Sequence, residues 1–330
     1  MSPPYGAETT GEELVQAFAS QIKGKVILTT GVSPGGLGAF FVEVIAKAQP
    51  DLLILAGRDT TKVQKTADTI TAAHKDVKVR VLKLDLASLK QIREAAATVN
   101  SWTDVPHIDV LMNNAGIMAC DYGKSEEGFE KQFATNHLGP FLFTNLIIEK
   151  VIAASRPRVV MVSSDGHRLG AIRFDDYNFD NGETYDKWRS YGQSKTANML
   201  FALSLAEKLG KRGLSAYSLH PGVIGTNLGA KLDWEVDFND LRERALDKVQ
   251  GNKEGWADFK FKTGDSGSGV ATHVYAAFDP SLSGRNGAYL QDCHVGDPWT
   301  DTVKPWATNG VEAERLWLLS EKLVGETFKY

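Results

Sequence analysis

The chain has 330 residues, of which 37 are lysine or arginine and 41 are aspartate or glutamate, so its formal net charge is −4. Hydrophobic residues make up 42% of the sequence, which is typical of a globular protein that can bury a stable core without disulfide or metal cross-links. The charge is nearly balanced and no basic run occurs, which excludes the phosphate-binding surface that a nucleic acid partner requires.

The two cysteines, Cys120 and Cys293, belong to no C-x-x-C pair and no His/Cys cluster. This excludes a disulfide framework and a structural zinc site, and since His167 and His294 also lack ligand spacing, we expect no bound metal. The first residues, MSPPYGAETTGEEL, predict neither a signal peptide nor an anchor. The most apolar stretch, Phe141–Ile148, is far shorter than the roughly 20 residues that span a bilayer. We therefore expect a cytoplasmic protein without a membrane anchor.

Short aliphatic or β-branched runs alternate with segments of helical period along most of the chain. The predicted strands cover residues 25–30, 52–57, 77–84, 108–114, 158–164, 214–220 and 287–290. The predicted helices cover residues 38–48, 60–73, 88–99, 126–154, 188–211 and 268–278. Such alternation is typical of βαβ units. It predicts an α/β, doubly wound Rossmann fold with a seven-stranded parallel sheet and helices on both faces.

We expect a single domain over residues 23–292, after an extension (1–22) with a short helix and before an extension (293–330) that ends in a helix. Two stretches, 165–189 and 228–262, are long, aromatic-rich and without strand period, and such connections are usually functional or disordered. Their aromatic side chains are Phe174, Tyr177, Phe179, Tyr185 and Trp188, and then Trp234, Phe238, Trp256, Phe259 and Phe261. Ligands bind beyond the carboxyl ends of parallel strands, so these loops are candidate lids over an apolar substrate. The alternative is that the aromatic residues only bury the loops on the domain.

The first predicted strand leads into TTGVSPGGLG, residues Thr29–Gly38, directly before a helix. Glycines at this place let the backbone approach a pyrophosphate, and the helix N-terminus offers unpaired N–H groups, so the loop indicates dinucleotide binding. The second strand ends at Gly57, followed by Arg58 and Asp59. An arginine here pairs with the 2′-phosphate of NADP, which we favour, whereas an acidic residue binds the ribose of NAD. Asp59 is also a good helix N-cap.

Tyr191 and Lys195 are four residues apart in a predicted helix, which places phenol and ammonium on one face. A phenol is a poor acid or base near neutrality, and a neighbouring cation lowers its pKa toward the working range. The pair alone is weak evidence for a catalytic role, because this spacing occurs by chance in most chains of this length.

Further motifs give the pair its meaning. In chain order they are TG…GLG at the first strand, LDL (84–86), NNAG (113–116), TNHLG (135–139), VSS (162–164), YGQSK (191–195) and HPGVIGT (220–226). In this order they resemble the short-chain dehydrogenase/reductase family over about residues 22–292, and most of all its NADP-preferring branch of retinol-dehydrogenase-like proteins and fungal reductases.

The resemblance implies a catalytic tetrad of Asn136, Ser164, Tyr191 and Lys195. Tyr191 would donate or accept the proton and Ser164 would hydrogen-bond the substrate oxygen. Lys195 would lower the pKa of Tyr191 and bind the nicotinamide ribose, and Asn136 would hold a water in a proton relay. Ser163 competes for the serine role, and Asn136 could instead be a polar residue satisfied by a backbone carbonyl.

The resemblance also implies NADP(H) as cofactor. The residues that would contact it are Gly31, Ser33, Pro34, Gly36, Leu37, Gly38, Arg58, Asp85, Leu86, Asn114, Ala115, Gly116, Tyr191, Lys195, Pro221, Gly222, Val223 and Thr226. Asp85 could equally be a turn or cap residue, and the Pro221–Gly222 pair an ordinary turn. The family loop has glycines at relative positions 0, 4 and 6, whereas here they stand at 0, 4, 5 and 7, so the turn is one residue longer around Pro34.

These features predict an NADPH-dependent carbonyl reductase, or alcohol dehydrogenase in reverse, that acts on a small, apolar carbonyl or alcohol substrate. The alternatives are a non-catalytic dinucleotide-sensing or scaffold protein and, on the same fold, a nucleotide-sugar epimerase or dehydratase. The protein is expected to be a monomer or a homodimer, because the 126–154 and 188–211 helices form dimer interfaces in many relatives and terminal extensions could cover them.

Overall fold

The computed structural model describes residues 5–229, 232–233, 235–237 and 269–330. Within these ranges the strands form one sheet in the order β3-β2-β1-β4-β5-β6-β7-β8. Their bounds are β1 Val26–Thr30, β2 Leu52–Gly57, β3 Lys78–Lys83, β4 Val110–Asn113, β5 Arg158–Val162, β6 Ser215–His220, β7 Tyr289–Gln291 and β8 His294–Val295. Strands β1 to β7 run parallel, which confirms the predicted α/β fold, and the chain reverses direction in the sheet order between β1 and β4.

Strand β8 is the difference from the predicted sheet of seven strands. It pairs antiparallel with β7 through Leu290 and Gln291. The turn between the two strands is made by Asp292 and Cys293, which have φ of 45° and 58°. This turn contains neither glycine nor proline, so Asp292 is the one usual turn residue in it and the sequence signal is weak.

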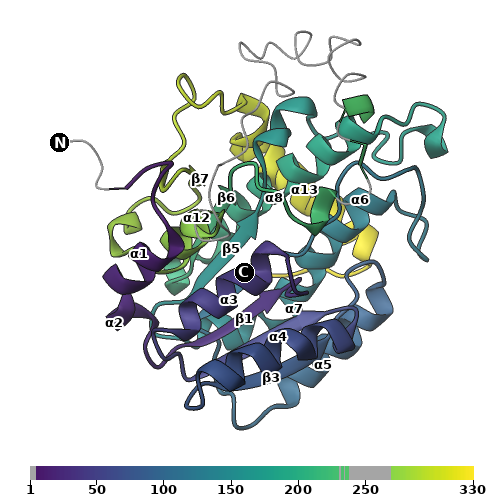
Figure 1. Ribbon diagram of the computed structural model, residues 1–330. Coiled ribbons are helices and arrows are strands. Elements are labelled where there is room, and N and C mark those ends of the chain that lie inside the picture. The colour runs from purple at the N-terminus through teal and green to yellow at the C-terminus, as the bar shows by residue number, and fades with distance from the viewer. Residues whose placement is uncertain (1–4, 230–231, 234, 238–268) are drawn as a thin grey trace.

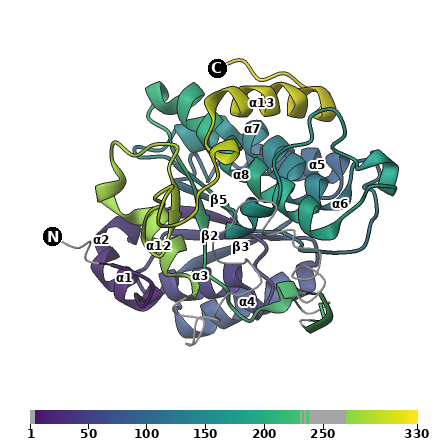
Figure 2. The same ribbon diagram turned by 90° about the horizontal axis from the view of Figure 1, so that it is seen from above.

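Helices cover both faces of the sheet, as Figures 1 and 2 show. Their bounds are α1 Gly11–Ala17, α2 Ala19–Ile22, α3 Leu37–Ala46, α4 Thr60–Ala73, α5 Leu89–Ser101, α6 Lys131–Phe133, α7 Gly139–Ile152, α8 Lys187–Leu209, α12 Ala271–Phe278 and α13 Gly310–Val324. In Figure 2, α1 to α4 and α12 lie on one side of the sheet, and α5, α7, α8 and α13 lie on the other. Each side has its own buried apolar cluster, and the strands contribute to both.

The single helix predicted for residues 126–154 is wrong at its start. The chain forms the short helix α6, a π-helical segment over Ala134–Leu138, and then α7. The Glu130 carboxylate caps α6 by accepting hydrogen bonds from two backbone N–H groups. At the start of α7 the backbone passes so close to the chain after β3 that a Cβ on Gly139 would lie 2.4 Å from the Leu86 carbonyl oxygen. The π-helical segment is where Asn136 is located.

Helix α13 packs against α8 and carries the chain back over the α7 and α8 side of the sheet. Its Trp317 is 3% exposed, with its ring centroid 5.0 Å from that of Phe141 on α7. Ser204 on α8 donates a hydrogen bond of 3.1 Å to the carbonyl of Ala313. The outer faces of α7 and α8 are therefore partly covered by the chain's own C-terminal helix.

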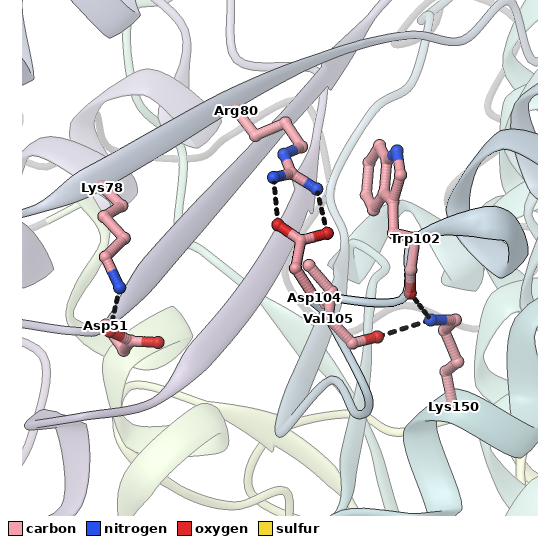
Figure 3. A network of polar contacts seen from close by, with 7 residues as sticks. All are labelled: Asp51, Lys78, Arg80, Trp102, Asp104, Val105 and Lys150. Carbon is pink, nitrogen blue, oxygen red and sulfur yellow. Dashed lines mark hydrogen bonds and ion pairs between the residues drawn. The ribbon is translucent and has the colours of Figure 1, made fainter.

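Strand β3 lies at the edge of the sheet and is held there by charged contacts, which Figure 3 shows. Arg80 forms two hydrogen bonds to the Asp104 carboxylate and stacks over the ring of Trp102 at 4.7 Å. Lys150, on α7, donates a bond of 2.7 Å to the Trp102 carbonyl. Lysine and arginine side chains on an edge strand also discourage pairing with another chain.

Candidate active site

A cavity of about 930 Å³ opens at the carboxyl ends of the parallel strands, around the point where the strand order reverses. Open α/β sheets bind their ligands at this place. Of the cofactor contacts predicted from the sequence, the following line the cavity: Gly31, Ser33, Pro34, Gly36, Leu37, Arg58, Asp85, Leu86, Asn114, Ala115, Gly116, Tyr191, Lys195, Pro221, Gly222, Val223 and Thr226. The catalytic candidate Ser164 lines it as well. Gly38 and Asn136 do not belong to this lining.

The glycine-rich loop fits a pyrophosphate through backbone groups. Gly31 has φ of +75°, and a Cβ there would lie 2.7 Å from the Cα of Ala115. Helix α3 begins at Leu37 with Gly36 as its N-cap, and no side chain caps it. The first N–H groups of α3 therefore face the cavity side without a side-chain acceptor, as an anion site requires. Gly38 serves packing, because a Cβ there would lie 2.6 Å from the Gly31 carbonyl oxygen.

The cavity beyond β2 is lined by cations. Arg58 follows β2, and Lys62 and Lys65 of α4 line the same cavity. The two lysines were not among the cofactor contacts predicted from the sequence. Their spacing of three on a predicted helix did indicate that they share one face. The Asp59 carboxylate also lines the cavity, but it caps α4 by accepting from the N–H groups of Thr61 and Lys62 at 3.0 and 3.2 Å. Asp59 thus has the capping contacts that the alternative interpretation predicted.

Asp85 has a local partner as well. Its Oδ1 accepts a hydrogen bond of 3.0 Å from the N–H of Ala87, which is the turn contact that the alternative predicted, while the side chain still lines the cavity. On the opposite side of the loop, Asn114 donates to the Thr30 carbonyl at 2.9 Å. That bond ties the strand carrying the NNAG motif to the glycine-rich loop.

Tyr191 and Lys195 lie one turn apart on α8, whose start is capped by Asp186. The Lys195 Nζ lies 5.5 Å from the centroid of the Tyr191 ring. Ser164 lies two residues after β5, and its Oγ accepts a hydrogen bond of 2.9 Å from the Gly166 N–H and interacts with the Tyr191 hydroxyl. A Cβ on Gly166 would lie 2.7 Å from the Tyr191 ring. The turn over residues 164–167, which we call the serine turn, is therefore in direct contact with the tyrosine ring. The structure brings these three predicted residues together.

Burial dominates the electrostatics of this group. Tyr191 is 3% exposed, and burial raises its pKa above the ordinary value, although the hydrogen bond to Ser164 opposes this rise. Burial also lowers the pKa of Lys195 to about 8. Burial is the largest cause of the shift in each group, and the expected effect of Lys195 on the Tyr191 pKa stays a prediction.

The two serines after β5 have different partners. Ser163 donates its hydroxyl hydrogen to the carbonyl oxygen of Lys195 at 2.7 Å. Ser164 instead interacts with the Tyr191 hydroxyl. The contact geometry favours Ser164 over Ser163 for the catalytic role.

Asn136 has backbone partners on both ends of its amide. Its Nδ2 donates to the Ile117 carbonyl at 2.9 Å, and its Oδ1 accepts from the Ile117 N–H at 2.8 Å. The Nδ2 also donates to the Ser194 hydroxyl at 2.9 Å. These contacts are the ones expected if Asn136 is a polar residue satisfied by a backbone carbonyl, which was the alternative to a role in a proton relay. They place Asn136 against Gly116, where an added Cβ would lie 3.2 Å from the Asn136 Oδ1 and 3.4 Å from the Lys195 Nζ.

Asp165 and His220 are site residues that sequence analysis missed. Both line the cavity, and the Ser164 Oγ donates a hydrogen bond of 3.1 Å to the Asp165 Oδ1. The His220 Nε2 lies 3.6 Å from the Asp165 Oδ2, and the two side chains are only 12% and 15% exposed. The available signal was that Asp165 directly follows the VSS motif and that His220 is the first residue of HPGVIGT. The Asp165 charge raises the pKa of Tyr191 further.

The aromatic residues of the first long loop do not line the described cavity. Phe179 and Trp188 are fully buried, and Phe174 and Tyr177 pack against the core on the α7 and α8 side. Tyr185 donates its hydroxyl hydrogen to the Cys120 carbonyl at 2.8 Å. These rings bury their own loop, as the alternative interpretation expects, and the assignment of residues 165–189 as a substrate lid stays a prediction. The residues Trp234, Phe238, Trp256, Phe259 and Phe261 lie outside the described residues.

In the described part of the chain, neither His167 nor His294 lies among the further side chains that a metal ion would need as ligands. His167 is buried, and His294 pairs with Asp301 at 2.9 Å. Within the described ranges, no three His, Cys, Asp or Glu side chains gather as a metal site would need. In the same part of the chain, no helix has the length and apolar character to cross a bilayer.

Comparison with known proteins identifies the family. The short chain dehydrogenase family matches residues 25–178. Retinol dehydrogenase 14 of Homo sapiens is 33% identical over 315 residues, which cover 92% of this chain and 87% of that protein. A short-chain dehydrogenase/reductase of Penicillium rubens is 34% identical over 314 residues, which cover 92% of this chain and 86% of that protein. The crystal structure of an uncharacterized protein from Mycobacterium paratuberculosis matches with a TM-score of 0.69 at 29% identity, covering 94% of this chain and 98% of that one. The chain therefore belongs to the short-chain dehydrogenase/reductase family of oxidoreductases, in its retinol-dehydrogenase-like branch.

Proposed function

We propose that the chain is an NADPH-dependent carbonyl reductase, and an alcohol dehydrogenase in the reverse direction, with Ser164, Tyr191 and Lys195 at its catalytic centre. The observation that carries this proposal is that the three side chains share one cavity with Arg58. Arg58 follows β2 and Ser164 follows β5, which are three strand spacings or roughly 14 Å apart. A dinucleotide extended across the strand ends would span these two positions.

The preference for the phosphorylated cofactor rests on the charges beyond β2. Arg58, Lys62 and Lys65 offer positive charge to a 2′-phosphate. The carboxylate that could instead accept from the ribose hydroxyls of NAD belongs to Asp59, and it already accepts two backbone hydrogen bonds at the start of α4. Three cationic side chains, against the carboxylates of Asp59 and Asp85, line this part of the cavity, which supports NADP(H) over NAD(H).

The chemistry assigns a separate task to each catalytic side chain. When bound, the reduced nicotinamide supplies a hydride to the carbonyl carbon of the substrate. Tyr191 donates its phenolic proton to the carbonyl oxygen, and Ser164 hydrogen-bonds the same oxygen as charge develops on it. Lys195 stabilises the phenolate that remains, and its buried ammonium lies within the same turn of α8. Asn136 supports Gly116 beside Lys195 through its bonds to Ile117.

An apolar substrate agrees with the remaining lining of the cavity. Besides the polar residues above, its walls include the side chains of Ile117, Met118, Ile224 and Leu228. Binding sites for small organic molecules are mostly apolar, with a few polar groups that orient the ligand. The proposed substrates are therefore ketones or aldehydes with an apolar body.

The proposal is tested by following the loss of NADPH absorbance with a panel of aliphatic and aromatic ketones and aldehydes, for the wild type and for Tyr191→Phe. We expect turnover by the wild type and a loss of at least about a hundredfold in kcat for the variant, since general acid catalysis contributes roughly this much. NADPH binding without turnover by the wild type on any substrate would instead support the non-catalytic dinucleotide-sensing alternative. Equal rates for wild type and variant would reject the assigned role of Tyr191.

We also propose that α13 disfavours dimer formation through α7 and α8. Trp317 and the contact between Ser204 and Ala313 occupy the face that a partner subunit would use. Light scattering on the purified protein would test this, with a monomer as the expected result. If a dimer forms, Leu318→Glu and Val311→Glu on the exposed side of α13 show whether that helix is at its interface.

A further inference from the structure

His167 connects the catalytic serine to a distant part of the chain. It is fully buried, and its Nδ1 lies 2.8 Å from the carbonyl oxygen of Ser164. On the other side of the ring, the N–H of Lys304 donates to the His167 Nε2 at 3.2 Å. Because a carbonyl can only accept and a backbone N–H can only donate, the ring must carry its hydrogen on Nδ1. Burial lowers the pKa of His167 to about 3, so the ring is neutral at any physiological pH.

The residues that contact His167 and its neighbours from the C-terminal side form a short segment, residues 301–307, which we call the C-terminal strap. The strap precedes α13 and follows β8 (Figure 1). Trp306 donates its indole N–H to the His167 carbonyl at 3.2 Å. Arg168 donates to the Asp301 carbonyl at 2.6 Å. The strap is thus attached to the serine turn at three points, one of them through the imidazole ring.

The strap is itself fixed by packing. Val303 and Ala307 are buried in a small apolar cluster with Met199 of α8 and Tyr289 of β7. The Tyr289 ring also contacts the His167 ring, with centroids 5.3 Å apart. The strap therefore joins a rigid layer between α8 and the edge of the sheet, and a displacement of it would be transmitted to His167.

We propose that the C-terminal strap is a structural part of the active site, and that His167 is the positioning residue through which the strap holds Ser164 in place. This inference rests on the proposed function, since it concerns how the serine of that site is held. Ser164 lies two residues after β5. The N–H of the preceding Ser163 bonds to the Leu219 carbonyl of β6, whereas the Ser164 carbonyl accepts from the backbone N–H and the Nδ1–H of His167. A catalytic group that shifts by as little as 1 Å can lose about a hundredfold in rate, so such a support has a measurable effect.

A single substitution removes the link without altering the imidazole. Lys304 has φ of −79°, which proline adopts, and its N–H is the donor to the His167 Nε2. Lys304→Pro deletes this N–H, and Lys304→Ala keeps it while losing the same side chain. The two variants are compared with each other, so that any effect of the lysine side chain is common to both.

We expect Lys304→Pro to have a kcat at least about fivefold below that of Lys304→Ala, while the KM values of the two variants for NADPH differ by less than about twofold. A purely structural role would lower the melting temperature of Lys304→Pro and leave its kcat equal to that of Lys304→Ala. Equal kcat values would therefore overturn the inference. If Lys304→Pro does not fold, Trp306→Phe takes its place, because it removes the indole N–H that donates to the His167 carbonyl, together with part of the ring that packs beside Val303 and Ala307. An unchanged kcat for that variant would overturn the inference in the same way.

Amide hydrogen exchange tests the same link without any activity. The N–H groups of Gly166 and His167 bond to the side chain and the carbonyl of Ser164. If the strap holds this turn, they exchange at least about fivefold faster in Lys304→Pro than in Lys304→Ala. A wild type that turns over no carbonyl substrate would reject the proposed function, and the exchange rates would still decide the inference. Equal exchange in the two variants would overturn it.

Discussion

Lys195 donates a hydrogen bond from its ammonium to the carbonyl oxygen of Val162 at 3.1 Å, in a site where its side chain is almost fully enclosed. Asn198 donates to the same carbonyl at 3.1 Å, so that acceptor keeps a partner if the lysine is replaced. The buried ammonium keeps the Val162 carbonyl as an acceptor but loses its hydration by water. This loss lowers its pKa to about 8.

The depressed pKa of Lys195 predicts how stability depends on pH. Since the unfolded chain holds the lysine proton up to about pH 10.5 and the folded chain only to about pH 8, the unfolded state binds more protons between these values. The free energy of unfolding of the wild type, relative to that of Lys195→Met, should therefore be flat below pH 8 and rise toward pH 10.5. Urea unfolding of both proteins across this range measures the difference. A flat difference throughout would show that the lysine is not buried as a cation.

The Asp165 carboxylate should set the pH range in which the enzyme oxidises alcohols. Burial is the larger cause of the raised pKa of Tyr191, and the charge of Asp165 raises it further. Asp165→Asn should therefore lower that pKa. Alcohol oxidation needs the tyrosine without its proton, and the rising limb of kcat/KM should accordingly move to lower pH in the variant. The control is Asp51→Asn, which removes a carboxylate at the opposite ends of the strands, where the side chain is 53% exposed. If the rising part of the kcat/KM–pH profile moved equally in both variants, a local effect of Asp165 would be excluded.

Arg58 should decide between the two nicotinamide cofactors. A charge-assisted hydrogen bond to a phosphate is worth about 1.5–3 kcal/mol, so Arg58→Ala should raise the KM for NADPH by roughly 10- to 100-fold. The KM for NADH should change by less than about twofold, because NADH has no 2′-phosphate to lose that contact. Lys62→Ala tests the second cation on the same side of the cavity and should act in the same direction. Equal effects on both cofactors would remove Arg58 from the 2′-phosphate site.

The sequence predicts the sheet and the cavity lining well because both depend on local patterns. Strands such as Leu52–Gly57 are apolar on both faces, and only a strand covered by helices on both sides has that composition. Glycines such as Gly31 mark close backbone approach, which is a requirement of the local turn. Tyr191 and Lys195 stand at a spacing that a helix brings to one face. For these residues, chain order and secondary structure are enough to bring the side chains together.

Other features depend on contacts between distant residues and leave little trace in the sequence. Phe179 lies on a loop and Trp188 at the start of α8, and an aromatic residue looks the same in the sequence whether it covers a substrate or is buried in the core, as these two are. Asp165 and His220 pair across two neighbouring strand ends, and only the register of β5 and β6 decides that their side chains meet. The strap contact to His167 joins residues 137 positions apart. Such pairs follow from packing, which a single sequence does not specify locally.

Asn227 should control how tightly the cofactor is held at the glycine-rich loop. Its side-chain amide donates a hydrogen bond of 2.9 Å to the carbonyl of Pro34, at the position where this loop is one residue longer than the family pattern. Both residues line the cavity, so the bond connects the segment after β6 to the loop after β1 beside the pyrophosphate position. Asn227→Ala removes an exposed hydrogen bond worth about 0.5–1.5 kcal/mol, which corresponds to a rise of roughly two- to tenfold in the Kd for NADPH. Thr308→Ala, at an exposed position after the strap, provides a control in which the Kd should not change. Quenching of tryptophan fluorescence on NADPH addition measures both values, and an unchanged Kd for Asn227→Ala would show that the longer loop holds its shape without this bond.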